Sequence, residues 1–212
     1  MGLLRFSDDA FLREVCGHLE GRLPECLPQH ISNSVYSLAL LGYEHRSLFL
    51  AVATHMPERL HEFKAQEISN VLYSFGILGF VHDKLLLTLC ERLPERLEEF
   101  NEQNVSNVVY SLGLLDFRHE KFMQAACSHM RTRLDGFTPQ GIANVLHALG
   151  MLFFRHRPLL QAVCAHTSSN LSKFDEQNIS NIMQALGRLN HRDEGFLQAV
   201  CAQVPSRIEE FK

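Results

Sequence analysis

The chain has 212 residues, of which 46% are hydrophobic and 21% are charged, and its formal net charge at pH 7 is −4. This composition is typical of a globular protein, and the acidic balance argues against tight binding to nucleic-acid backbones without regard to sequence, although a basic stripe on one face is compatible with it. No apolar run approaches the roughly 18 residues of a membrane-spanning helix, and the N-terminal residues lack the apolar segment of a signal peptide, so we expect neither a membrane protein nor a targeting or transit peptide in this chain.

Apolar residues at helical spacing predict helices along the whole chain, and no segment favours a strand. In chain order, six first helices are expected, each opening near a His or an Asp, over residues 8–20, 45–57, 82–93, 119–131, 156–167 and 193–204. Five second helices lie within segments that resemble one another, at 29–43, 66–80, 103–117, 140–154 and 177–191. First and second helices alternate, which predicts a series of helical hairpins.

The second segments repeat one pattern, of which QEISNVLYSFGILGF (66–80) is an example. Corresponding residues lie 37 positions apart, so that Asn33 is followed by Asn70 and Asn107. Repeats of about 20–50 residues are typical of solenoids, in which each unit buries its apolar side against its neighbours. We therefore expect an all-α, right-handed superhelical solenoid of helix-turn-helix repeats that forms a single domain over residues 1–212. Its expected units are 8–44, 45–81, 82–118, 119–155, 156–192 and a partial unit at 193–212, which predicts a longer array or one that a partner continues.

Several polar residues that could suggest metal chemistry are better explained as helix caps. The caps expected for the first helices are His45, His82, His119 and His156, with Asp8 and Asp193 at the two ends. Asn101, Thr138 and Asp175 are the corresponding caps of second helices. Neighbouring helices of a solenoid lie about 8–10 Å apart, too far for two of these His to share a zinc ion with ligand distances of about 2 Å. We expect no metal site.

Five of the six cysteines occupy one repeat position, at which the remaining copy has Ala53: Cys16, Cys90, Cys127, Cys164 and Cys201. A position that accepts Cys or Ala favours a small apolar side chain in a helix interface. A disulfide requires Cα atoms within about 7 Å, so we expect unbridged thiols and a reducing compartment. The sequence contains no P-loop, GxSxG or HExxH motif, which predicts a protein that is not an enzyme and has no cofactor or small-molecule substrate.

Each second helix also carries a Gln and, four residues later, an Asn. On a helical wheel the apolar side chains of residues 66–80 form one stripe, and Asn70 lies roughly opposite it. Amides both donate and accept hydrogen bonds, so this polar face is either a structural ladder between repeats or a surface that contacts RNA bases or a peptide backbone. The candidate RNA-binding amides are Gln66, Gln103, Gln140, Asn33, Asn70, Asn107, Asn144 and Asn181.

Two further sets of positions give candidate contacts. The residue after the Gln varies between copies, as expected either for a position that selects one base per repeat or for an unconstrained surface position: His30, Glu67, Asn104, Gly141 and Asn178. Arginines recur at two repeat positions, where they either contact phosphates or belong to a surface of mixed charge, because acidic residues are close in sequence. They are Arg22, Arg59, Arg96, Arg133 and Arg207 at the first position, and Arg118, Arg155 and Arg192 at the second.

The pattern F-x-x-Q-x-I-S-N-x-x-Y-x-L-G-x-L resembles the octotricopeptide and heptatricopeptide repeats, and 63–78 and 100–115 are close matches. These helical-hairpin repeats are related to the FAST-kinase-like proteins, and some relatives carry a RAP domain, which nothing in this chain matches. The period of this chain is closer to that of the heptatricopeptide class. The resemblance implies an RNA-metabolism factor of mitochondria or chloroplasts that binds single-stranded RNA in transcript stabilisation, processing, translation or ribosome assembly.

The sequence therefore predicts a non-enzymatic module that binds single-stranded RNA with sequence selectivity in an organelle. The alternative is a protein-binding scaffold, or a structural subunit of a large organellar complex, whose groove holds a peptide or whose open end stacks on a partner. In both cases protein partners or a continuation of the array are expected.

Overall fold

The computed structural model describes residues 8–203, and within this range the protein is all-helical, without a strand. The prediction that concerns Arg207 falls outside the described residues. The predicted helices are confirmed in number and order for the described part of the chain. Their bounds differ from the expected ones by a few residues, mainly because the last residues of each second segment form the turn that follows the helix.

Two sets of helices alternate along the chain. The outer helices are α1 (Asp9–Gly21), α3 (Arg46–His55), α5 (Asp83–Arg92), α7 (Glu120–Arg131), α9 (Arg157–Ser169) and α11 (Glu194–Gln203). The inner helices are α2 (Pro28–Leu40), α4 (Ala65–Leu78), α6 (Glu102–Leu114), α8 (Pro139–Met151) and α10 (Glu176–Arg188). Short 3₁₀ helices, which the sequence did not predict, lead from outer to inner helices: Leu23–Glu25, Met56–Glu62, Leu93–Glu99, Leu134–Gly136 and Leu171–Lys173.

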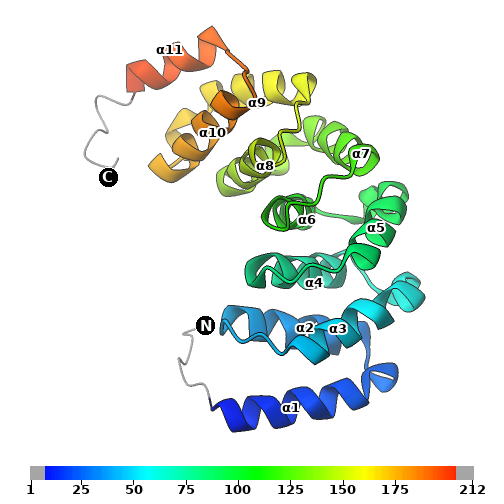
Figure 1. Cartoon of the computed structure of the whole chain (residues 1–212). Coiled ribbons are helices and arrows are strands. Elements are labelled where there is room, and N and C mark those ends of the chain that lie inside the picture. Colours follow the sequence, from blue (N-terminus) through cyan, green and yellow to red (C-terminus); the bar gives the residue numbers. More distant parts are fainter. Residues whose placement is uncertain (1–7, 204–212) are drawn as a thin grey trace.

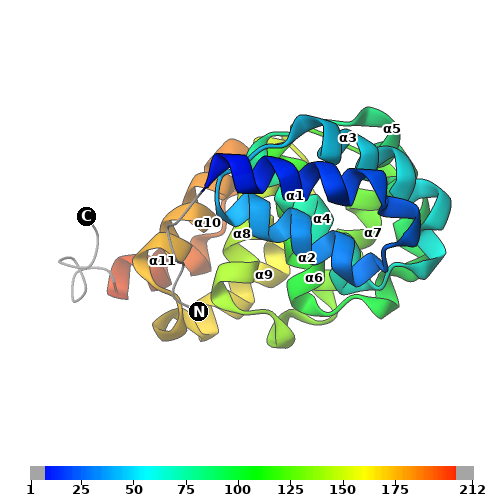
Figure 2. The same cartoon turned by 90° about the horizontal axis from the view of Figure 1, so that it is seen from below.

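The helical hairpins stack into a curved array (Figure 1). The helices α4, α6, α8 and α10 line the inner side of the arc, whereas α5, α7 and α9 lie on its outer side. In the view along the stack (Figure 2), successive hairpins are rotated relative to one another, as in a helical solenoid. The inner helices pack against one another much more extensively than the outer helices do, which is why the array curves toward them.

Small residues allow the inner helices to approach closely. A Cβ atom added to Gly113 of α6 would lie 2.7 Å from the Cβ of Ala148 in α8. At Gly76 an added Cβ would lie 3.0 Å from the Cα of Ser111, and at Gly150 it would lie 3.1 Å from a backbone atom of α10. Glycine at these positions therefore sets the short distance between adjacent inner helices.

The predicted caps of the outer helices are confirmed. In each case the Nδ1 atom of the His accepts a hydrogen bond from the backbone N–H three residues later, at 3.1–3.4 Å. The residues are His45, His82, His119 and His156. Asp8 and Asp193 cap α1 and α11 in the same way, and Asn101, Thr138 and Asp175 cap their inner helices as predicted.

Each inner helix ends in a left-handed residue. Its φ lies between 48° and 68°, and the following residue donates its N–H to a carbonyl one turn back, as Phe154 does to Leu149 at 2.9 Å. This is the Schellman geometry, which favours Gly or Asn at the left-handed position. The five residues are Gly42, Gly79, Asp116, Phe153 and Asn190.

The core is continuous along the array and contains most of the cysteines that share one repeat position. Cys16, Cys90, Cys127 and Cys164 are buried, whereas Cys201 on α11 is exposed, and all six cysteines are unbridged. Burial raises the pKa of the Cys90, Cys127 and Cys164 thiols to about 12. Among residues 8–203, no helix has the length and apolar character needed to cross a membrane.

Candidate functional site

The predicted amide face lies on the surface of the inner helices. The Gln side chains of all five copies are exposed, and Asn33, Asn70, Asn107, Asn144 and Asn181 are exposed or half-buried. The buried residues of α4 include Phe75, whose ring centroid lies 5.3 Å from that of Phe49 on the outer helix α3. The amides therefore face the inner side of the arc.

These amides do not form a ladder between repeats. Within the described residues, the one hydrogen bond between two amides of this face joins Gln177 Nε2 to Asn181 Oδ1 at 3.1 Å, inside α10. For residues 8–203, no hydrogen bond is formed by the side-chain amides of Asn70, Asn107 and Asn144. The geometry thus favours the alternative in which they are available to a ligand.

An aromatic row that sequence reasoning did not assign lies beside the amides. It consists of one residue per helix, three positions after the Asn: Tyr36, Tyr73, Tyr110 and His147. The ring centroids of Tyr36 and Tyr73 are 6.1 Å apart, and those of Tyr110 and His147 are 6.4 Å apart. All four are half-buried. The recurring Tyr in the repeat pattern was the signal that could have identified them.

Two members of the aromatic row have pKa values shifted in the direction that favours the neutral side chain. Burial, together with the neighbouring phenols of Tyr36 and Tyr110, raises the pKa of Tyr73. Burial and the positive charge of Arg188 lower the pKa of His147, which keeps its imidazole neutral. The row therefore offers aromatic faces and hydrogen-bonding groups without charge.

The amides and aromatic rings share one hollow of about 470 Å³. Its lining includes Tyr36, Tyr73, Gln103, Asn107 and Asn144, which come from four consecutive inner helices. We refer to the whole surface as the amide–tyrosine strip, and its members are Gln66, Gln103, Gln140, Asn70, Asn107, Asn144, Tyr36, Tyr73, Tyr110 and His147. Amides can pair with base edges and aromatic rings can stack on bases, so the strip is suited to an extended, unpaired polymer.

The variable residue that follows each repeated Gln does not belong to the accessible amide face in most copies. Asn104 is only 7% exposed, and its Nδ2 donates to the Ser69 hydroxyl of the preceding inner helix at 3.1 Å. Asn178 and Gly141 are buried as well, and Glu67 accepts a hydrogen bond from the backbone N–H of Lys64 at 2.8 Å. His30 alone among the five is exposed. Outside the first copy these residues are buried or half-buried and contribute to helix starts and repeat contacts, so an unconstrained surface position is wrong for Asn104, Gly141 and Asn178.

The first arginine row connects neighbouring repeats. Arg96 donates to the carbonyl oxygens of Leu60 and Phe63 at 3.0 and 2.8 Å and also pairs with Glu99. Arg59 likewise donates to the Leu23 carbonyl at 3.3 Å. Arg133 pairs with Glu98, and Arg22 pairs with Glu25. The guanidinium groups of Arg59 and Arg96 are thus occupied by the protein.

The second row crosses to the following repeat. Arg118 donates to the Phe153 carbonyl at 3.2 Å, pairs with Glu120 at 3.0 Å and lies over the Phe154 ring. Arg155 donates to the Asn190 carbonyl at 2.8 Å, and Arg192 pairs with Glu194 at 2.6 Å. All three arginines of this row stay exposed, so the structure leaves each of them accessible as a phosphate-contact candidate.

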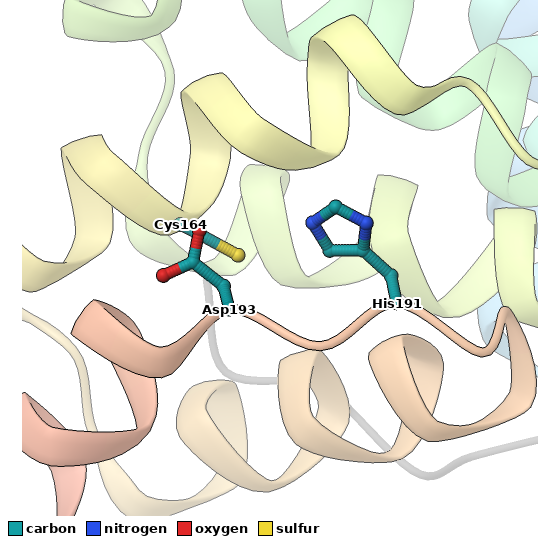
Figure 3. Close-up of side chains that lie close together, drawn as sticks. All are labelled: Cys164, His191 and Asp193. Carbon is teal, nitrogen blue, oxygen red and sulfur yellow. The ribbon is translucent and has the colours of Figure 1, made fainter.

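Three residues from different repeat positions come together at the C-terminal end. The potential ligand atoms of Cys164, His191 and Asp193 lie within 4.8 Å of one another, and Figure 3 shows one His191 ring nitrogen directed toward the Cys164 thiol and the Asp193 carboxylate. The distance between neighbouring helices excludes a shared metal ion only for residues at the same repeat position. Cys164, His191 and Asp193 come from three different repeat positions, so that distance does not apply to them.

The chemistry of this cluster fits packing better than metal binding. Asp193 Oδ1 is engaged in capping the N–H of Phe196 at 2.9 Å. Burial, followed by the charge of Asp193, raises the pKa of the Cys164 thiol to about 12, so the thiol is protonated when no metal is bound. His191 occupies the position that Phe80, Phe117 and Phe154 hold in other copies, so its ring fills an aromatic site.

Two comparisons with known proteins bear on this arrangement. No curated protein matches the chain. The model of the RNA-editing substrate-binding complex 6 protein family (RESC6) matches residues 2–204. Because this match spans nearly the whole chain, the chain belongs to the RNA-editing substrate-binding complex 6 protein family.

Proposed function

We propose that this protein binds single-stranded RNA along the amide–tyrosine strip, as a non-enzymatic subunit of a larger RNA-protein complex. The family is that of a component of an RNA-editing substrate-binding complex, which supports a role with RNA and with protein partners. We place this role in the mitochondrion. The kinship with octotricopeptide-type repeats, the 37-residue period and the right-handed superhelix remain predictions.

The observation that carries the proposal is the set of accessible amides beside aromatic rings on consecutive inner helices. The amides of Asn107 and Asn144 have both donors and acceptors, so they can pair with the edges of unstacked bases. Tyr73 and Tyr110 provide aromatic faces, on which bases stack regardless of sequence. Because these contacts are neutral, the strip is compatible with a net charge of −4. One base per inner helix is the expected register.

Paired amide substitutions test the proposal. Asn107→Ala combined with Asn144→Ala should weaken binding to a labelled random single-stranded RNA by about a hundredfold, if each lost base contact contributes about 1–2 kcal/mol. The melting temperature should stay the same, because these amides form no hydrogen bonds in the described structure. Gln124→Ala with Gln161→Ala, which removes two exposed amides from the outer helices α7 and α9, is the matched control and should bind RNA normally. Equal affinities of both double variants would contradict the proposal.

Selection from a random RNA pool tests sequence selectivity separately. An enriched unpaired motif of about one nucleotide per inner helix is expected, and its loss from the Asn107→Ala, Asn144→Ala variant would connect the motif with the strip. Binding without enrichment would leave RNA binding in place and contradict selectivity.

A second candidate function is supported by the first outer helix. Phe11 and Val15 on α1 are 62% and 45% exposed, whereas the corresponding Leu48 and Val52 are buried on α3, which packs against α1. These side chains border a hollow of about 710 Å³. A protein partner that presents a helical repeat would bury this face. Sedimentation of wild type and of Phe11→Ser should reveal concentration-dependent self-association in the wild type alone if a second copy is that partner.

A further inference from the structure

Phe153 holds an unusual conformation for its side chain. It is the left-handed residue that ends α8, with a φ of 50°, and its ring is 68% exposed. The corresponding residues of other copies include Gly42, Gly79 and Asn190, the residue types that this conformation favours. An aromatic residue there is strained, and exposure of its ring gives no burial to offset that strain.

The fold uses the backbone of Phe153 and leaves its ring without a structural role. Its carbonyl accepts a hydrogen bond from Arg118 Nη1, and Asn190 one repeat later accepts the equivalent bond from Arg155. This contact is therefore independent of the side chain. The buried aromatic of the same turn is the next residue, Phe154, whose ring lies under the Arg118 guanidinium.

The turn that contains Phe153 is also basic. Its sequence, FFRHR from 153 to 157, contains two arginines and no acid, whereas each corresponding turn at 42–46, 79–83, 116–120 and 190–194 contains at least one acid. Exposure alternates along it: Phe153, Arg155 and Arg157 are exposed, and the two residues between them are buried. Neither arginine forms an ion pair within residues 8–203, so an exposed ring and two available cations share one turn.

The face of α8 that belongs to the amide–tyrosine strip ends next to this turn. On α8, Gln140, Asn144, His147 and Met151 follow at spacings of four, three and four residues, which places them on one helix face. Phe153 comes two residues after the last of them. The FFRHR turn therefore lies at the edge of the strip, at the C-terminal end of α8.

We propose that the FFRHR turn is a second RNA contact, in which an unpaired base stacks on the Phe153 ring and the adjacent phosphates pair with Arg155 and Arg157. This inference rests on the proposed function and extends it from neutral base contacts to an anchoring site. An exposed aromatic flanked by arginines is suited to unpaired nucleic acid, because the ring accepts any base face and the guanidinium groups neutralise phosphates. The two arginines favour this ligand over an apolar protein surface.

A tryptophan placed at the turn reports stacking directly. The chain contains no tryptophan, so Phe153→Trp gives a single tryptophan, whose emission can be excited selectively in the intact protein. Addition of random single-stranded RNA should quench its emission, and the titration should give the affinity that is measured with labelled RNA. Asp116→Trp places the fluorophore at the same turn position one repeat earlier, also exposed and with a φ of 50°, and should show little quenching.

RNA affinity and thermal stability should change in opposite directions in Phe153→Asn. Asn is the residue at the same turn position in the next repeat, at Asn190. RNA binding should weaken by about tenfold, as for loss of one stacked base, whereas the melting temperature should rise by about 2–4 °C through relief of strain.

The salt dependence of RNA binding tests the two arginines. Arg155→Gln with Arg157→Gln should reduce the slope of log affinity against log salt by about 1.4, at roughly 0.7 per phosphate contact on single strands.

The outcomes separate this inference from the proposed function. Unchanged RNA affinity in Phe153→Asn, or an unquenched fluorophore in Phe153→Trp, would overturn the inference, whereas weakened binding in Asn107→Ala, Asn144→Ala would still support the strip. Failure of the wild type to bind single-stranded RNA would overturn the function and the inference together. Weakened binding in Phe153→Asn with an unaffected amide double variant would support this turn and contradict the strip.

Discussion

The Nδ1 atom of His156 accepts a hydrogen bond from the backbone N–H of Leu159 at 3.1 Å, and the His156 side chain is buried at this cap. Burial, followed by the charge of Arg131, lowers the pKa of His156. Because the folded pKa lies below the unfolded one, the unfolded state binds more protons as pH falls below about 6.5, and stability is lost as pH drops toward the folded pKa. Protonation of Nδ1 also removes the acceptor of the cap.

We therefore expect thermal stability to fall between about pH 7.5 and about pH 5, with His156 as one cause. His156→Asn preserves a capping side chain that does not titrate, so its melting temperature should depend less on pH in this window. Thermal unfolding followed by circular dichroism at several pH values measures the difference. Parallel curves for the variant and the wild type would exclude His156 as a contributor.

The arginines of the first row should affect stability, and not RNA affinity. Arg96→Ala removes the hydrogen bonds to the Leu60 and Phe63 carbonyls, and should lower the free energy of unfolding by about 2 kcal/mol. Arg22→Ala is the matched control, because Arg22 is largely exposed and pairs with Glu25 alone, and should change stability by less than about 0.5 kcal/mol. Urea unfolding measures both. Weaker RNA binding by Arg96→Ala at unchanged stability would restore its role as a phosphate contact.

The capping residues could be predicted from the sequence because a cap is a local property. His119 and Asp175 need only the backbone of the next three residues to act as caps, and that backbone is implied by the helix itself. The apolar residues of the core could be predicted for a related reason, since their helical spacing within one helix requires no knowledge of neighbouring repeats. The same argument placed Asn70 on the accessible face correctly.

Contacts between repeats could not be predicted in this way. A helical wheel treats one helix in isolation, so it gave no sign that the preceding inner helix covers Asn104, or that the Leu60 and Phe63 carbonyls occupy Arg96. Likewise, the Cys164–His191–Asp193 cluster joins three different repeat positions, so it depends on how one repeat is placed against the next. The left-handed φ of Phe153 has a sequence signal only in its equivalents, such as Gly79 and Asn190, because Phe itself does not favour that conformation.

His191 should be replaceable by the aromatic residue of the other copies. Its Nε2 atom is buried without a hydrogen-bond partner in the described structure, and an unpaired buried nitrogen costs about 1 kcal/mol or more. His191→Phe installs the side chain found at Phe154 and should raise the free energy of unfolding by about 1 kcal/mol. Zinc should not change the melting temperature of the wild type. Stabilisation by zinc that His191→Phe abolishes would instead identify the cluster as a metal site.

The close approach of inner helices predicts opposite effects for two glycine substitutions. Gly113→Ala adds a Cβ that would lie 2.7 Å from the Cβ of Ala148, so α6 and α8 must separate, and stability should fall by about 1–3 kcal/mol. Gly187 occupies the corresponding place on α10, yet no atom of the described neighbours lies within 4 Å of its added Cβ. Gly187→Ala should therefore raise stability by about 0.5–1 kcal/mol through helix propensity.

Urea unfolding of the two variants tests this contrast, and because the substitution is identical, the intrinsic preference of Ala for helix cancels between them. The difference of about 1.5–4 kcal/mol then measures the contact between inner helices. Because that contact sets the spacing of the amide–tyrosine strip, Gly113→Ala should also weaken RNA binding, whereas Gly187→Ala should not. Equal stabilisation by both substitutions would show that the inner helices separate at little cost and that glycine does not fix their spacing.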